Sequence, residues 1–322
     1  MISGMSSRMM RELGATGGVI LRRDAIAGGL NDRVIARHVS NQIWHKVRRG
    51  AYVDRPLWDS LDPADHHRIL ARAVLRTSEC PAVLSHLSAA VEHGADTWDL
   101  DLSQVHLTRE DMKAGRHEAG VHQHRGRIGP DEVTERDGVP VVRAARAAVE
   151  VTTLCDAERG LVVMNSLLHA GATDLGDIKS VAAALDRWPD TLSTRIVIGL
   201  ADPRIESVGE SRTAYMLWSQ GLPYFEPQYK IRDSNGRVVA RVDFALPNLG
   251  VFLEFDGMQK YLELRGEKSL DQVMLEERQR ERLVCRLTGW VCIRITWADL
   301  AHPERIAREI RSVLLSRRPT AG

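Results

Sequence analysis

The sequence lacks the two features that would place a chain in a membrane or export it. It has no apolar run approaching the roughly 18 residues that a membrane-spanning helix needs. Its first residues, MISGMSSRMM, have no apolar centre of the kind found in signal peptides. Hydrophobic residues still occupy 43% of the 322 positions, which is too many for a disordered chain. We therefore expect a globular protein that does not span a membrane.

Cysteine is also scarce, and its spacing excludes common metal and redox motifs. The chain has four cysteines: Cys80, Cys155, Cys285 and Cys292. No two of them form a CxxC pair, so neither a zinc knuckle nor a dithiol motif is indicated. Scattered free cysteines are typical of a reducing compartment, which predicts a cytoplasmic protein.

The net charge is only +1, but it is unevenly distributed. Residues 1–55 carry a net charge of +6, residues 56–202 of −8, and residues 203–322 of +3. Turn-forming residues lie at 54–56 and at 199–203, close to the points where the charge changes. We therefore expect an α+β multidomain protein with a basic first domain, an acidic middle domain and a third domain.

The basic first segment has the order of elements of a winged helix-turn-helix. A short helix is predicted over 23–27, and Asn31 is a suitable N-cap for a second helix over 32–40. Strands are predicted over 43–47 and 51–53, joined by a tight turn that contains glycine.

Five side chains of this segment are candidate DNA contacts. In winged helices the second helix enters the major groove, and cations near it bind phosphates. Arg33 and Arg37 are four residues apart on one face, and His38 is expected to face outward with them. Arg48 and Arg49 lie in the turn between the strands. The alternative is a small helical domain with solvated arginines.

Two stretches resemble known antitoxins. The stretch GGVILRRDAIAGGLNDRVIARHVSNQIWHKVRRGAYV resembles the N-terminal winged helix of the AbiEi family, the antitoxins of type IV toxin–antitoxin (abortive infection) systems. The strings SHLSAAVEHG and GVPVVRAARAAVE, in a middle segment of mixed helices and strands, more loosely resemble the second domain of that family. The resemblance implies binding to promoter DNA, transcriptional repression and a toxin protein as partner.

The middle segment also contains histidines that invite a metal hypothesis. His117, His122 and His124 are close in sequence, and the last two share one face of a predicted strand. An exposed polar strand is the favoured alternative, because no cysteine or carboxylate completes the set. Ser85 and His86 suggest a nucleophile only weakly, since no acid or oxyanion motif accompanies them.

The last segment contains a hairpin that brings carboxylates together. With Asn248 and Leu249 at the centre of the loop, Asp243 lies opposite Glu254 and Arg241 opposite Asp256. Cβ atoms of such pairs are about 4.5–5.5 Å apart, and two like charges at that distance are unfavourable. Either a cation lies between them, as Mg²⁺ does with one or two carboxylates, or one carboxyl is protonated.

Further groups could complete or replace this site. Glu206 and Glu210, four residues apart on the preceding predicted helix, could supply another carboxylate. The alternative is an ion-paired sheet surface in which Arg241 bridges Asp256. On a charged helix predicted over 271–288, Gln279 and Arg282 could face the site, although a solvated helix face is equally consistent with the pattern.

The strings GESR, RVDFALP, LEFDG and LTGWVCIRITWADL resemble PD-(D/E)XK nucleases, close to the very-short-patch repair endonucleases. By this resemblance Glu210, Asp243 and Glu254 bind Mg²⁺ or Mn²⁺. The lysine usual two residues after the glutamate is Asp256 here, as in repair-type relatives, and Lys260 could supply the missing cation.

Two functions are therefore predicted for the protein, and both act on double-stranded DNA. The first is a metal-dependent endodeoxyribonuclease carried on a winged-helix domain, in phage defence or a toxin–antitoxin context. The second is an antitoxin-like transcriptional repressor whose nuclease-like domain is inactive.

Overall fold

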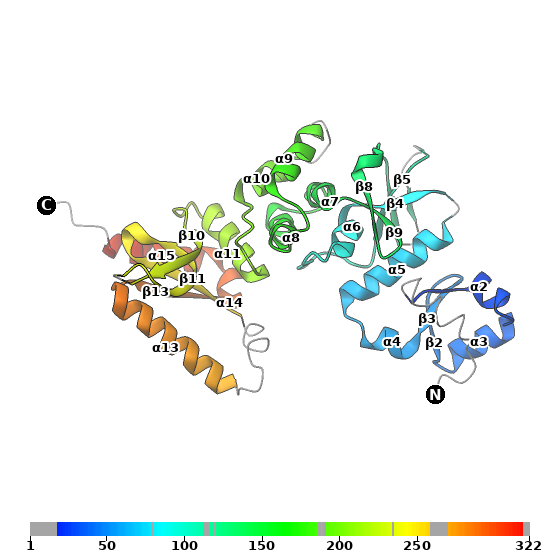
Figure 1. The fold of residues 1–322 in the computed structure, drawn as a ribbon, viewed down its shortest axis with the longest axis horizontal. Helices are drawn as coiled ribbons and strands as arrows, with labels where there is room; N and C mark the ends of the chain where they lie inside the picture. The colour runs from blue at the N-terminus through cyan, green and yellow to red at the C-terminus, as the bar shows by residue number, and fades with distance from the viewer. Residues whose placement is uncertain are drawn as a thin grey trace. The chain divides into compact units, whose positions relative to one another are not determined.

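The computed structural model describes residues 18–78, 80–111, 116–118, 120–185, 188, 191–233, 235–257 and 270–317. The chain forms two compact units, the first ending at Ile198 and the second beginning at Gly199. Both units mix helices and sheets, so the predicted α+β class is confirmed at that level (Figure 1). None of the helices in the described residues has the length and apolar character needed to cross a bilayer.

The first unit begins with two helices and a three-stranded antiparallel sheet of order β1-β3-β2. The Asn31 side chain accepts a hydrogen bond from the Val34 amide at 3.0 Å, which caps the second helix as predicted. Ile35 of that helix is buried against Trp44 of the sheet. In chain order the elements are β1 (Ile20–Leu21), α2 (Arg22–Ala27), α3 (Asp32–Ser40), β2 (Trp44–Arg48) and β3 (Ala51–Asp54).

Helix α5 (Pro63–Thr77), which follows the short helix α4 (Arg55–Ser60), belongs to two cores. Ile69 and Ala73 pack with the first sheet, whereas Ala71 and Val74 pack with the six-stranded sheet that follows. Arg76, near the end of α5, strengthens the contact between α5 and the N-terminal elements. It donates hydrogen bonds to the Asp24 carboxylate at 2.6 Å and to the Val19 carbonyl at 2.5 Å. The N-terminal elements are therefore fastened to α5.

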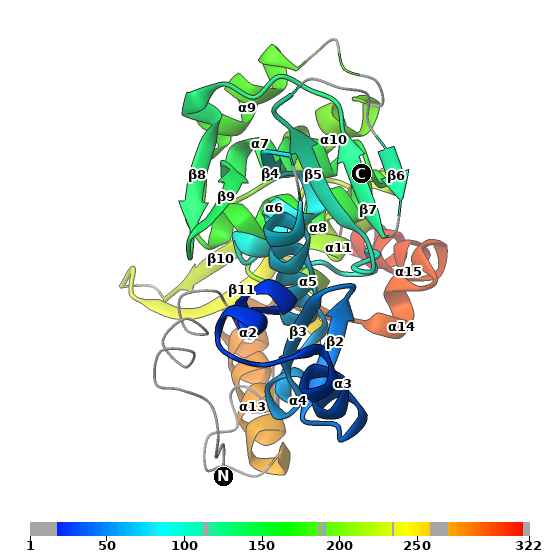
Figure 2. The same cartoon turned by 90° about the vertical axis from the view of Figure 1, so that its right-hand side faces the viewer.

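The six-stranded sheet has the order β6-β7-β5-β4-β9-β8. Figure 2 shows these strands side by side. The pairs β5–β7 and β4–β9 are parallel, and the other pairs are antiparallel. Its strands are β4 (Ala82–Leu84), β5 (Val105–Arg109), β6 (Arg116–Glu118), β7 (Val121–His124), β8 (Val133–Arg136) and β9 (Val139–Val142).

Helices and a 3₁₀ turn complete the described part of this unit. The turn is η1 (Pro130–Glu132). Helix α6 packs on β5 and on α7, and α7 contacts α8 and α9. The helices are α6 (His86–Glu92), α7 (Ala144–Val151), α8 (Ala157–His169), α9 (Leu175–Ala184) and α10 (Leu192–Leu200), the last of which runs into the second unit.

The second unit is built on a four-stranded sheet of order β10-β11-β12-β13, whose last pair is parallel. One set of its side chains packs with helices α11, α14 and α15, and another packs with α13 through Val284. The elements are α11 (Val208–Ser219), β10 (Glu226–Arg232), β11 (Val238–Leu246), η2 (Pro247–Leu249), β12 (Val251–Asp256), α13 (Leu270–Thr288), β13 (Val291–Thr296), α14 (Trp297–Leu300) and α15 (Pro303–Arg317).

The β11–β12 hairpin has the register predicted from its loop, with Phe244 paired with Leu253 in the core. Regular alternation along a strand would place Val242 on the same face as Phe244, but Val242 packs with Ala245. The alternation of side chains is disturbed where β11 runs past Gln228 of β10, whose φ of 54° is left-handed.

Candidate functional site

Three buried carboxylates on neighbouring elements are the main candidate site residues of the second unit. Glu254 on β12 is 4% exposed, Glu210 on α11 is 7% exposed, and Asp243 on β11 is 8% exposed. Charged carboxylates are rarely buried unless cations or hydrogen-bond donors stabilise them. Their burial therefore marks the central strands β11 and β12, together with α11, as a functional candidate.

Glu210 is held by donors that lie just before α11 and on β10. Ser207 caps α11 by accepting from the Glu210 amide at 3.2 Å, and its hydroxyl donates to Glu210 Oε1 at 2.8 Å. The Glu206 amide and Gln228 Nε2 donate to Oε2 at 3.1 and 2.7 Å. Burial raises the pKa of Glu210, and the nearby Asp243 carboxylate raises it further. The two carboxylates are thus close enough to repel each other.

Gln228 is a site residue that sequence reasoning missed. The register of β10 against β11 places it opposite Asp243, between the pairs Pro227–Phe244 and Tyr229–Val242. While its Nε2 donates to Glu210, its buried Oε1 accepts no hydrogen bond from the described residues. An amide oxygen that has no hydrogen-bond donor among the described residues and lies beside a carboxylate is a suitable ligand for a hard cation.

Asp243 and Glu254 also have protein partners. Asp243 Oδ2 accepts a hydrogen bond from the Phe255 amide at 2.8 Å, which fixes the carboxylate against β12. Glu254 Oε1 accepts from Arg280 Nη2 at 3.1 Å, while Arg280 Nη1 donates to the Arg241 carbonyl at 2.6 Å. Arg280 of α13 therefore supplies a positive charge to Glu254.

The sequence pattern left open whether two other residues of α13 face the site. Gln279 and Arg282, its candidates for facing the site, are both exposed. Arg280 lies between them and reaches Glu254 instead. The pattern gave little guidance, because the centre of this helix is charged nearly all round.

The ion pair between Arg241 and Asp256, which belonged to the alternative of an ion-paired sheet surface, does not form. Arg241 binds Glu206 through both guanidinium nitrogens, at 2.6 and 2.8 Å, and Asp256 pairs with Arg294 at 3.1 Å. The first of these pairs takes up the Glu206 carboxylate, so Glu206 does not serve as the extra carboxylate of the site. Lys260, the predicted additional cation, lies outside the described residues.

The donor set of this site suits a small divalent cation. The carboxylates of Glu210, Asp243 and Glu254 and the amide oxygen of Gln228 are hard oxygen ligands of the type that Mg²⁺ and Mn²⁺ prefer. The electrostatic repulsion that raises the pKa of Glu210 would be relieved by such an ion.

The candidate DNA-contacting arginines of the first unit fall into two groups. Arg33 and Arg37 on α3 and Arg49 in the β2–β3 turn are exposed, and none is ion-paired with a described residue. Arg48 is half-buried, and burial lowers its pKa. His38 does not face outward as predicted. Its ring lies 4.9 Å from that of Trp44, and its Nδ1 is 2.7 Å from the Val34 carbonyl oxygen.

The predicted histidine group is arranged differently from the expectation. His122 and His124 lie together on β7, but the third nearby ring belongs to His106 of β5. His117 on β6 is exposed and bonds the Gln104 side chain at 2.7 Å. His106 could be assigned to this group only once the strand order, with β5 beside β7, is known.

Ser85 and His86 do not form a nucleophile and base. His86 Nδ1 lies 3.0 Å from Ser85 Oγ and 3.3 Å from Glu150 Oε2. A catalytic triad requires the two ring nitrogens to contact different partners, whereas here one nitrogen faces both. Ser85 is also fully buried, so substrate has no access to it.

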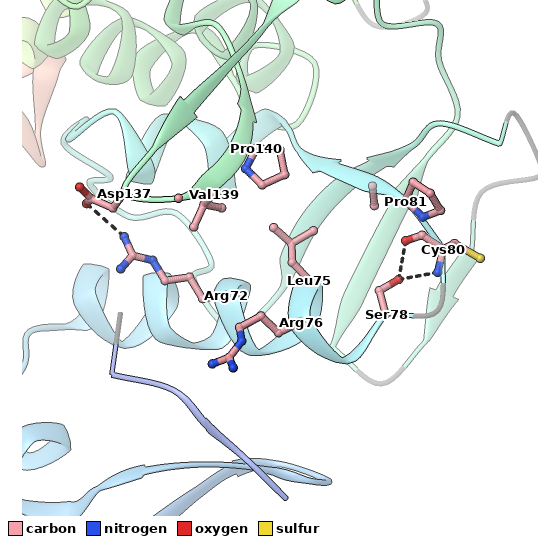
Figure 3. Close-up of a pocket in the computed structure, with 11 residues that line it drawn as sticks. Arg72, Leu75, Arg76, Ser78, Cys80, Pro81, Asp137, Val139 and Pro140 are labelled. Atoms are coloured by element: carbon pink, nitrogen blue, oxygen red, sulfur yellow. Dashed lines mark hydrogen bonds and ion pairs between the residues drawn. The ribbon is translucent and has the colours of Figure 1, made fainter. Parts of the chain in front are cut away.

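A cavity of about 560 Å³ in the first unit lies between α5, the start of β4 and the β8–β9 hairpin (Figure 3). Apolar side chains such as Leu75 and Val139 line it, with Arg72 and Arg76 at one side. Arg72 is paired with Glu92 and Asp137. Because Arg76 is also engaged, neither arginine marks an anion site.

No family model matches the chain. Two proteins of Mycobacterium tuberculosis, the uncharacterized protein Rv2248 of strain H37Rv and the uncharacterized protein MT2308 of strain CDC 1551, are each 28% identical to it over 167 residues. The match covers 52% of this chain and 58% of each relative, so the chain spans little more than half the length of these curated relatives. Neither description states an activity.

Proposed function

We propose that the protein binds DNA and that its second unit is a Mg²⁺- or Mn²⁺-dependent endodeoxyribonuclease of the PD-(D/E)XK type. The observation that carries the proposal is the burial of Glu210, Asp243 and Glu254 on neighbouring elements, with Asp243 close enough to Glu210 to raise its pKa. Gln228 binds Glu210, and its own amide oxygen accepts no hydrogen bond from the described residues. These residues come from α11, β10, β11 and β12, as the resemblance to these nucleases requires of a carboxylate helix and a central hairpin. The mixed sheet with its parallel β12–β13 pair is consistent with that fold.

In this proposal the carboxylates bind the metal, and the remaining residues position them. A divalent cation bound there supplies Lewis-acid activation of water and neutralises phosphate charge. Gln228 and Ser207 orient Glu210, and the Phe255 amide orients Asp243. Arg280 takes the place of the lysine that Asp256 replaces, and stabilises negative charge on the scissile phosphate.

The first unit supplies DNA binding as a winged helix. The order β1-α2-α3-β2-β3 and the antiparallel sheet support this. Arg33, Arg37 and Arg49 have no carboxylate partner among the described residues, so their charge is available to phosphates. The acidic segment 56–202 is the better surface for a basic protein partner such as a toxin.

One observation favours the second function, a transcriptional repressor with an inactive nuclease-like unit. Arg280 already provides a cation for Glu254, and Asp256 is held by Arg294. A site stabilised in this way does not require a metal in order to fold.

A cleavage assay with matched glutamate variants distinguishes the two functions. Full-length protein is incubated with supercoiled and linear DNA in Mg²⁺, Mn²⁺ or EDTA. We expect nicking or cleavage that Asp243→Asn and Glu210→Gln abolish. Glu206→Gln, four residues from Glu210 but paired with Arg241, is expected to retain it. Absence of cleavage by the wild type on every DNA form, with binding intact, would leave the repressor.

A further inference from the structure

A cluster of histidine rings lies on the six-stranded sheet of the first unit, outside the carboxylate site. The parallel pairing of β5 with β7 places His106 beside His122. His124 is two residues further along β7 and therefore on the same face, with its ring 4.0 Å from that of His122. The strand register alone thus gathers three imidazoles.

The nitrogen atoms of these rings lie close enough to share one ion. One ligand nitrogen from each of His106, His122 and His124 lies within 4.8 Å of the others. His106 Nδ1 and His124 Nε2 are only 2.8 Å apart. A tetrahedral ion with bonds of about 2.0–2.1 Å separates its ligands by about 3.3 Å, so this pair needs to open by roughly 0.5 Å.

The surroundings keep the rings neutral and in place. Burial lowers the pKa of His106 to about 4 and that of His124 to about 3, aided by the neighbouring histidines. Neutral imidazoles have the lone pairs that metal coordination needs. The buried His86 ring stacks on His124 at 3.5 Å and restricts its rotation. The positively charged Arg125, which follows His124 in the sequence, is exposed to solvent.

We propose that His106, His122 and His124 form a binding site for one transition-metal ion of the Zn²⁺ type. Imidazole nitrogens suit Zn²⁺, Ni²⁺ and Cu²⁺ rather than Mg²⁺, so this site is chemically distinct from the carboxylate site. Three protein ligands leave a fourth position for water or another ligand. His122 and His124 are only half-buried, which allows an ion to enter from solvent.

Cobalt spectroscopy on the full-length chain tests the proposal. Four-coordinate Co²⁺ has a visible absorption band that six-coordinate Co²⁺ lacks at comparable strength, and Zn²⁺ should displace it. We expect one equivalent bound in the wild type and in Asp243→Asn, whose carboxylate site is impaired. His122→Gln and His124→Gln should weaken binding by about tenfold or more, as outer partners of metal ligands already account for about 10–100-fold.

His117→Gln is the matched control, because His117 lies on the adjacent strand and bonds Gln104. It should keep both the band and the affinity. Circular dichroism of each variant checks its folding, and His122 is the more informative ligand because it is less buried than His106. The proposal is overturned by a wild type without the band, by a band that survives in His122→Gln, or by an equal loss in His117→Gln.

Discussion

Replacement of Arg280 by methionine tests whether the carboxylate cluster is built to hold a cation. Arg280 Nη2 lies 3.1 Å from Glu254 Oε1, and the two side chains are 33% and 5% exposed. Methionine retains much of the aliphatic bulk and removes the positive charge. The variant therefore takes one cation away from a buried carboxylate without creating a large cavity.

The expected loss follows from the burial of the pair. Removing one partner of a fully buried ion pair costs about 3–5 kcal/mol. Because a third of Arg280 is exposed, solvent screens the pair and reduces the loss to about 1–3 kcal/mol. In a unit of this size, 1 kcal/mol shifts the melting temperature by about 4 °C, so a decrease of about 4–12 °C is expected in EDTA.

Scanning calorimetry with and without Mg²⁺ or Mn²⁺ provides the assay. A divalent ion should raise the melting temperature of Arg280→Met more than that of the wild type, because it no longer competes with the guanidinium for Glu254. Arg282→Met, two residues along the same helix and exposed, should change neither value. Equal effects of both substitutions, or no additional stabilisation by metal, would refute the reasoning.

Three further outcomes are expected. A Cβ at Gly209 would lie 2.0 Å from the buried ring of Phe255, so Gly209→Ala should destabilise the second unit by about 1–3 kcal/mol in urea unfolding. The folded-state pKa of Glu210 is raised, so the ionised carboxylate destabilises the fold above that pKa. In EDTA, the free energy of unfolding should therefore rise as the pH falls through the folded-state pKa. Glu210→Gln should flatten this pH dependence. Arg33→Ala with Arg37→Ala should weaken DNA binding and reduce the slope of log K against log salt by about 2 in fluorescence anisotropy.

Each outcome has a control on the same chain. Gly199→Ala places its Cβ in open space and should cost little in the urea experiment. Glu206→Gln should leave the pH dependence of stability in place, since Glu206 is partly exposed. Arg22→Ala removes an arginine already paired with Asp32 and should change the salt slope less than the double substitution. If a control substitution has as large an effect as the substitution it is compared with, the corresponding assignment is contradicted.

Local signals predicted features of both units. The loop centred on Asn248 and Leu249 was sufficient to set the β11–β12 register. Asn31 likewise marked the start of α3, because a short polar side chain at that position satisfies an otherwise unpaired amide. Such features depend on a few neighbouring residues, which is why the sequence alone reveals them.

Features that depend on tertiary context were missed. Choosing Arg280 over Arg282 requires the rotational phase of α13, which a helix charged on most sides does not encode. The role of Gln228 depends on a left-handed backbone in the middle of a strand. His106 meets His122 only because β5 and β7 are parallel neighbours, although β6 intervenes in sequence. His38 was misplaced because its ring packs on Trp44.

Helix α5 limits how the N-terminal elements, β1 to β3, can be used on their own. One side of this helix supplies Ile69 and Ala73 to their core, and another supplies Ala71 and Val74 to the six-stranded sheet. A fragment cut between residues 55 and 56 would therefore expose its apolar underside and lose the clamp made by Arg76. These elements therefore do not form an independent folding unit that can be transferred to another protein. A shortened protein made to test the proposed DNA binding, or a graft onto another protein, has to carry α5 and a replacement for the sheet that α5 covers.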